Sequence, residues 1–217
     1  MIIVSGMPRS GSSLMMQTLK HLGVPLVGED SFDFKGNSYL HSQAVPQEDQ
    51  DNITKHNPQG YYDIPFEFHP LFTDNYNQGQ AIKLLGPVSI LPVPLDYVEH
   101  VIICTRNSLD NQALSYMKLA KLDVEIMDKE ILVNRMDPLS VRAKTLEYYR
   151  YMELSDFKDL ITFGQESIDR WWSESNRPYT RVVLEDILKK PTEKFSGIQK
   201  ALGLKGSIEK ALTNVRN

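Results

Sequence analysis

Short apolar runs alternate along the chain with segments that carry apolar residues at helical spacing. Four of these runs predict buried strands, at residues 2–4, 81–85, 101–104 and 182–184. The first run leads through a loop rich in glycine and serine into Met15, Leu19 and Leu22 at helical spacing, with Gly23 as a helix stop. This order of strand, loop and helix indicates an α/β fold.

Two further helices are predicted. The strand ending at Cys104 leads into a helix that begins near Ser108, which repeats the order of the first unit. Asp137 and Pro138 provide a cap and a first turn for another long helix, which we expect to run to Met152.

A polar stretch between the first helix and the second strand has no clear period. It contains Pro46 and Pro58, and we interpret residues 36–62 as a long loop. Loops of this length inside compact domains are often lids or substrate loops, and partial disorder is the ordinary alternative. With 217 residues, of which 41% are hydrophobic, residues 1–217 are expected to form one domain around one core.

Composition narrows the choice of partners and compartment. The net charge of -4 at pH 7 gives no support for nucleic acid or an anionic membrane as a partner, although it leaves room for a local basic pocket. Cys104 is the only cysteine and lies in an apolar run, which predicts a buried thiol in a reducing compartment. The first residues lack the pattern of a signal peptide and no run reaches the length of a membrane span, so we expect a cytoplasmic protein.

The loop after the first strand has the composition of an anion site. It reads Gly6-Met7-Pro8-Arg9-Ser10-Gly11-Ser12-Ser13, and it lies where free backbone N–H groups and the positive end of a helix can hold an anion. Its glycines have the spacing of the nucleotide-triphosphate loop G-x-x-x-x-G-K-[ST], yet Ser12 stands where that motif has its lysine. This difference counts against an ATPase or a kinase, and Arg9 supplies positive charge instead.

Two stretches carry a resemblance to a known family. The residues from Pro8 to Ser13 resemble the 5′-phosphosulfate loop of sulfotransferases, P-[RK]-[ST]-G-[ST]-[ST]. The residues from Arg106 to Ser115 are similar to their 3′-phosphate motif R-[DN]-P-x-D-x-x-x-S, with one residue more before the serine, which in the usual pattern falls on Leu114. An arginine fork and a hydroxyl suit a phosphate dianion because both donate hydrogen bonds. Taken singly, the stretches also fit a plain turn and a surface salt bridge.

The resemblance implies a three-layer, P-loop-like α/β fold with a central parallel sheet flanked by helices. It also implies a sulfotransferase that moves a sulfuryl group from 3′-phosphoadenosine 5′-phosphosulfate (PAPS) to a hydroxyl or amine and releases 3′-phosphoadenosine 5′-phosphate (PAP), without a metal. The residues implied to bind this nucleotide are Pro8, Arg9, Ser10, Gly11, Ser12, Ser13, Arg106 and Ser115.

Weaker likenesses extend along the chain. Residues 57–61 are similar to an N-P-x-G-Y segment of bacterial sulfotransferases, and residues 184–187 resemble their Y-E-D-L segment. Leu184 replaces the tyrosine of the second segment.

Sulfuryl transfer needs positive groups near the transferring and bridging oxygens. Arg9 is the first candidate, and Lys83 is the second because residues 81–87 are similar to the K-T-H-x-P strand of animal cytosolic sulfotransferases. The alternative for Lys83 is a strand-end lysine that reaches water. Leu85 stands where those enzymes have the histidine that acts as general base, so that role cannot be carried over.

Another base is implied by a likeness to the tyrosylprotein sulfotransferases. The stretch Val27-Gly28-Glu29-Asp30 is similar to their C-G-E-E segment, which implies Asp30, or its neighbour Glu29, as the group that takes the acceptor proton. The alternative is that both acids are solvated in a loop.

Other functions stay open. A P-loop nucleotide or small-molecule kinase would bind ATP with Mg²⁺, and a catalytically degenerate member would bind a nucleotide without turnover. The sequence leaves the acceptor undetermined, with a small molecule or a glycan as our expectation. No group of His, Cys, Asp and Glu has metal-ligand spacing.

Overall fold

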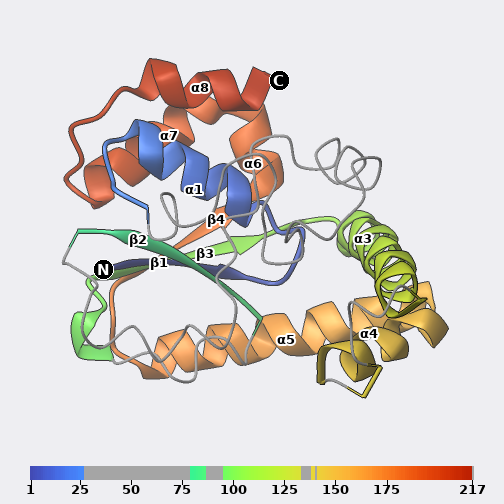
Figure 1. The fold of residues 1–217 in the computed structure, drawn as a ribbon. Helices are drawn as coiled ribbons and strands as arrows, with labels where there is room; N and C mark the ends of the chain where they lie inside the picture. Colours follow the sequence, from blue (N-terminus) through green and yellow to red (C-terminus); the bar gives the residue numbers. More distant parts are fainter. Residues whose placement is uncertain (27–78, 87–94, 133–137, 140, 217) are drawn as a thin grey trace.

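Four parallel strands form the central sheet, in the order β2-β1-β3-β4 (Figure 1). They are β1 (Ile2–Gly6), β2 (Ala81–Leu85), β3 (His100–Thr105) and β4 (Tyr179–Val183). The computed structural model describes residues 1–26, 79–86, 95–132, 138–139 and 141–216. Gly6 lies opposite Cys104 in the pairing of β1 with β3, so the loops that follow these two strands leave from the same edge of the sheet.

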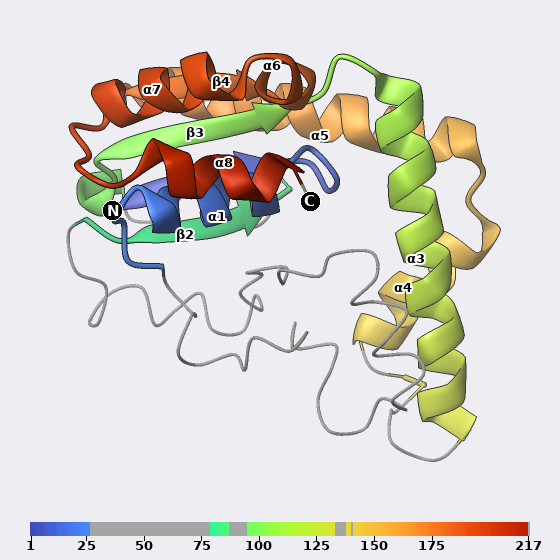
Figure 2. The same ribbon diagram turned by 90° about the horizontal axis from the view of Figure 1, so that it is seen from above.

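Helices cover both faces of this sheet, which confirms the predicted three-layer α/β fold with a central parallel sheet (Figures 1 and 2). One face carries α1 (Ser12–His21), α6 (Leu184–Lys189), α7 (Pro191–Ala201) and α8 (Ile208–Arg216). The other face carries α5 (Leu154–Glu174), and α3 (Leu109–Leu132) and α4 (Val141–Tyr151) lie beyond the carboxyl ends of the strands. A short 3-10 helix, η4, spans Leu95–Tyr97.

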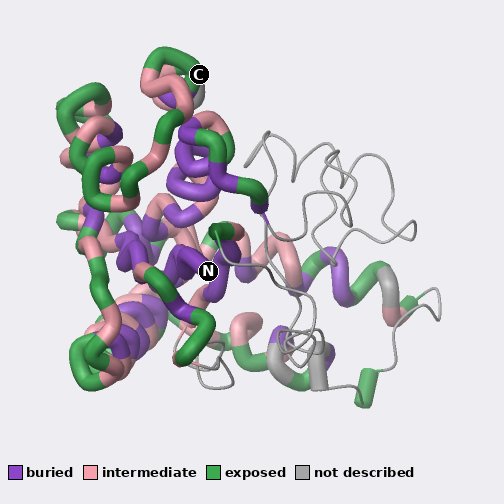
Figure 3. Tube along the Cα trace, turned by 90° about the vertical axis from the view of Figure 1, so that its left-hand side faces the viewer, coloured by how far each residue is buried: buried purple, intermediate pink, exposed green. Residues whose placement is uncertain are grey.

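The strands β1, β2 and β3 bury side chains on both faces, which is why they read as continuous apolar runs in the sequence, whereas in β4 only Val182 is buried. Ile3 and Ile103 point to the core under α5, whereas Val4 and Ile102 point to the core under α1. Buried residues accordingly concentrate in the sheet and on the helix faces that contact it (Figure 3). This double burial holds the carboxyl ends of β1 and β3 rigidly side by side.

Cys104 is buried, as predicted, and is 2% exposed at the end of β3. Burial raises the pKa of its thiol to about 12, although the charge of nearby Lys83 acts in the opposite direction.

Two predicted boundaries are wrong. Leu184 was expected to end a strand, but it begins α6, because Glu185 and Asp186 in the first turn favour the positive end of a helix at this point. The helix expected to start at Pro138 begins only at Val141, and the described residues 138–139 form a turn, which the fixed φ of proline also suits.

The expected lid at 36–62 lies outside the described residues, as do the N-P-x-G-Y likeness and the acids of residues 29–30. Among the helices that the structure describes, none is long and apolar enough to cross a membrane.

Candidate functional site

The loop between β1 and α1 packs too tightly to carry side chains at its two glycines. A Cβ atom at Gly6 would lie 2.5 Å from the carbonyl oxygen of Cys104, and one at Gly11 would lie 2.9 Å from Cδ1 of Leu184. Gly11 also has a φ of 95°, and Arg9 has a φ of 66°, which is uncommon for a residue with a side chain. The loop backbone is therefore pressed between β3 and α6 in a fixed shape.

This loop presents the amino end of α1 to a ligand. No acidic residue lies in the first turn of α1, and its N-cap, Gly11, has no side chain that could satisfy the first backbone N–H groups. Ser10 is 1% exposed, and its Oγ has no hydrogen-bond partner among the described residues. A helix amino end without a side-chain cap, beside a buried hydroxyl, fits an anionic group such as a phosphate.

Lys83 brings a positive charge to the same helix end. It pairs with Val4 in the sheet, is 2% exposed, and donates a hydrogen bond from Nζ to Oγ of Ser13 over 3.1 Å. The lysine therefore does not reach water, which was the alternative interpretation of its place on the strand. A buried ammonium at the first turn of α1 adds to the attraction of this end for an anion.

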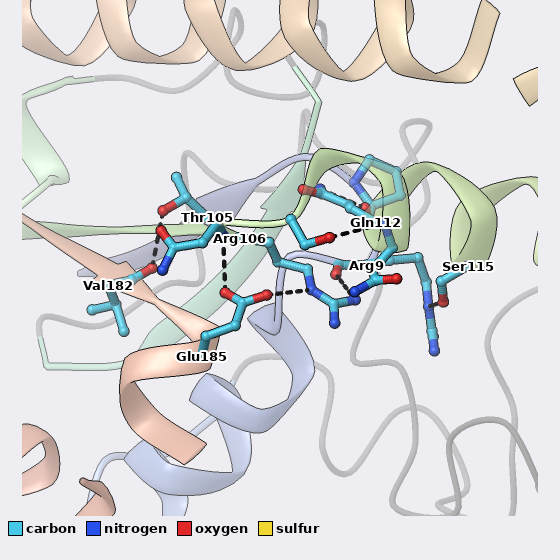
Figure 4. A network of polar contacts seen from close by, with 11 residues as sticks. Arg9, Thr105, Arg106, Gln112, Ser115, Val182 and Glu185 are labelled. Carbon is cyan, nitrogen blue, oxygen red and sulfur yellow. Dashed lines mark hydrogen bonds and ion pairs between the residues drawn. The ribbon is translucent and has the colours of Figure 1, made fainter. Parts of the chain in front are cut away.

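The two predicted anion sites are called cradles here: the first is the loop from Gly6 to Ser13, and the second, the 3′-phosphate motif, begins directly after β3. The side chain of Arg106 is 20% exposed and donates from Nε to Oε1 of Glu185 over 3.2 Å (Figure 4). The backbone N–H of Asn107 donates to Oε2 of the same carboxylate over 2.9 Å. Burial acts to raise the pKa of Glu185, but the hydrogen bonds from Asn107 and Arg106 lower it, and the net direction is down. The pair is thus a charged one, formed between the end of β3 and the start of α6.

The two cradles meet at Arg9. Its Nε donates to Oγ of Ser115 on α3 over 2.8 Å, and its carbonyl oxygen accepts a long hydrogen bond of 3.5 Å from Nη1 of Arg106 (Figure 4). The structure therefore brings together the arginine of the first motif and the arginine and serine of the second. Leu114, the position that the usual motif would favour, is 38% exposed.

Gln112 was not predicted. It is 4% exposed, and its Nε2 donates to the carbonyl oxygen of Pro8 over 3.0 Å. It lies one helical turn before Ser115, so both residues face the loop from the same side of α3. The spacing of three residues from Ser115 could have indicated that Gln112 faces the loop, but an isolated glutamine in a sequence does not indicate that it will be buried.

A cavity of about 210 Å³ lies between α3 and α5, and Arg106 and Gln112 form part of its wall. Its other lining residues come mainly from α5, and Arg9 is not among them. Ligand pockets usually enclose roughly 300 to 1,000 Å³. The volume of the cavity is below this range, and the cavity adjoins the loop through Arg106 and Gln112.

The structure places most of the predicted site residues around the loop, and two of them lie outside the described residues. Pro8, Arg9, Ser10, Gly11, Ser12 and Ser13 form the loop and the start of α1, and Lys83, Arg106 and Ser115 contact that loop or lie next to it. Asp30 and Glu29 lie outside the described residues. Glu185 lies in the weak Y-E-D-L likeness, which gives no sign of its contact with Arg106.

The chain matches no protein-family model and no curated protein. Among solved structures it is similar to crystal structures of retinol dehydratase: one "in complex with androsterone and inactive cofactor PAP", at 14% identity and a TM-score of 0.49, and one "in a complex with retinol and PAP", at 16% and 0.45. Each comparison covers 99% of this chain and 63% of the other, so the chain spans less than two thirds of the solved chains. Both TM-scores are below 0.5, so the site assignment rests on this chain's own contacts.

Proposed function

We propose that the protein is a PAPS-dependent sulfotransferase that transfers a sulfuryl group to a hydroxyl or amine. One observation carries the proposal: two strand-to-helix junctions, each suited to an anion, meet through the contacts of Arg9 with Ser115 and Arg106. PAPS carries an anionic group at each end of one ribose. Two adjacent anion cradles therefore suit this nucleotide better than a nucleotide with a single phosphate chain.

In this proposal the loop and the amino end of α1 bind the 5′-phosphosulfate, and Arg106 with Ser115 binds the 3′-phosphate. Lys83, which contacts Ser13, would stabilise negative charge on the oxygen that leaves with PAP. Arg9, which bonds to Ser115, would lie between the two anionic groups and neutralise both. Arg9 and Lys83 thus keep the catalytic role that the motifs imply, and the loop from Pro8 to Ser13 keeps its binding role.

The chemical step needs a base. The acceptor oxygen or nitrogen bonds to sulfur, the bond from sulfur to the bridging oxygen breaks, and the acceptor gives up a proton. Asp30, or else Glu29, is the proposed proton acceptor. Leu85 has no group that could take its place. A small-molecule or glycan acceptor and a cytoplasmic location belong to the same proposal.

Calorimetric titration tests the nucleotide assignment. Wild-type protein should bind PAP at least tenfold more tightly than adenosine 5′-phosphate, which lacks the 3′-phosphate. Arg106→Ala should weaken PAP binding by about tenfold to a hundredfold, the effect of about 1.5 to 3 kcal/mol for a charge-assisted hydrogen bond, and leave adenosine 5′-phosphate binding unchanged. Arg177→Ala is the matched control, because Arg177 pairs with Asp96 at the amino end of β4. Equal binding of the two nucleotides by the wild type would refute the proposal.

Titration with ATP and a transfer assay distinguish the two alternative functions. A kinase requires Mg²⁺-dependent binding of ATP and no preference for PAP, and the loop lacks the lysine of that class at Ser12. A degenerate member would bind PAP as tightly as an enzyme does. It would transfer no sulfuryl group when PAPS and an acceptor are followed over a single turnover.

A further inference from the structure

The start of α6 forms a third wall of the site. Leu184, its first residue, packs against Gly11, and Glu185, its second, holds Arg106. This short segment therefore touches both proposed cradles, although it belongs to neither of the motifs that predict them. A carboxylate here is unexpected, because it lies beside a group proposed to bind a phosphate dianion.

The geometry shows what the carboxylate does to Arg106. Oε2 of Glu185 is held by the backbone N–H of Asn107, which cannot move without the end of β3, and Oε1 accepts from Nε of Arg106. The guanidinium is thereby fixed along its Nε edge, while Nη1 points toward the carbonyl of Arg9. An arginine held in this way offers its terminal nitrogens in one direction, and less rotamer freedom is lost when a ligand binds.

We propose that Glu185 is a positioning residue that aims Arg106 at the 3′-phosphate, so that it determines the preference for a bisphosphorylated nucleotide. This inference rests on the proposed function. Repulsion between the Glu185 carboxylate and the 3′-phosphate is the opposing effect, because it would lower the affinity for PAP. Removing Glu185 weakens PAP binding if positioning dominates and strengthens it if repulsion dominates.

The test compares Glu185→Ala and Glu185→Gln with the wild type in titrations with PAP and with adenosine 5′-phosphate. We expect Glu185→Ala to weaken PAP binding threefold to tenfold and to leave adenosine 5′-phosphate binding unchanged. Glu185→Gln keeps one accepting oxygen but no charge, so its affinity for PAP should lie between those of the wild type and Glu185→Ala. Asp186→Asn is the matched control, since Asp186, the next residue of α6, pairs with Lys194 of α7.

Each outcome has a distinct meaning. A merely structural role for Glu185 would lower both affinities together, and the melting temperature would fall with them, which overturns the inference. Tighter PAP binding by both variants would also overturn it, in favour of repulsion. If the wild type prefers PAP and Glu185→Ala leaves that preference intact, the inference fails while the proposed function stands. If the wild type itself shows no preference, the proposed function fails and the inference fails with it.

Discussion

The backbone of Arg9 stores strain that can be measured. Its φ of 66° lies in the left-handed region, which costs an ordinary residue roughly 1 to 2 kcal/mol. The neighbouring residue Pro8 is held by the hydrogen bond that its carbonyl oxygen accepts from Gln112. Glycine adopts it freely, so Arg9→Gly removes the strain, whereas Arg9→Ala keeps it.

Both substitutions also remove the hydrogen bond to Ser115, so this loss cancels when the two variants are compared. The greater freedom of glycine in the unfolded chain offsets part of the gain, by about 0.4 to 1 kcal/mol. We therefore expect Arg9→Gly to have a free energy of unfolding about 0.5 to 1 kcal/mol higher than that of Arg9→Ala. Both variants should bind PAP more weakly than the wild type.

Urea unfolding followed by circular dichroism measures this difference. The same pair of substitutions at Arg170, an exposed residue within α5, is the control. In a helix the order reverses, because alanine is favoured over glycine by about 1 kcal/mol. If Arg9→Ala proves at least as stable as Arg9→Gly, the left-handed conformation of Arg9 is refuted, and with it the account of how the loop is held.

Two further predictions concern the residues around the loop. Gly11→Ala should lower the free energy of unfolding by about 1 to 3 kcal/mol, because the new methyl group meets Leu184 and the φ of 95° is strained for alanine. Thermal melting measures this loss. A variant as stable as the wild type would contradict the packing of the loop against α6. Cys104 should resist a thiol reagent in the native protein at pH 8 and react at once in urea, since burial raises its pKa to about 12. The unfolded chain releases the thiol proton at a lower pH than the folded one, so stability should fall as pH rises above the ordinary thiol range, and Cys104→Ala should make this slope smaller.

Part of this molecule could be predicted from the sequence. The strands were recognisable because a parallel sheet covered on both faces needs continuous apolar runs, and the loop at Gly6 to Ser13 was recognisable because glycines and hydroxyls between a strand and a helix suit an anion. These features are local, since they depend on residues that are neighbours in the chain. The start of α6 at Leu184 was missed for the converse reason, because a short apolar run at a strand end does not reveal where a helix takes over.

The contacts of the site were decided by the tertiary structure. Arg9 and Ser115 are separated by 106 positions and meet only because β1 and β3 are neighbours in the sheet. Lys83 could have faced water, and it faces α1 because of the side of β2 on which the pairing register places it. The holding of Arg106 by Glu185 depends on β4 lying next to β3. Sequence fixes which residues can bind an anion, whereas the order and register of the strands determine which of them act together, because both are set by packing across the whole sheet.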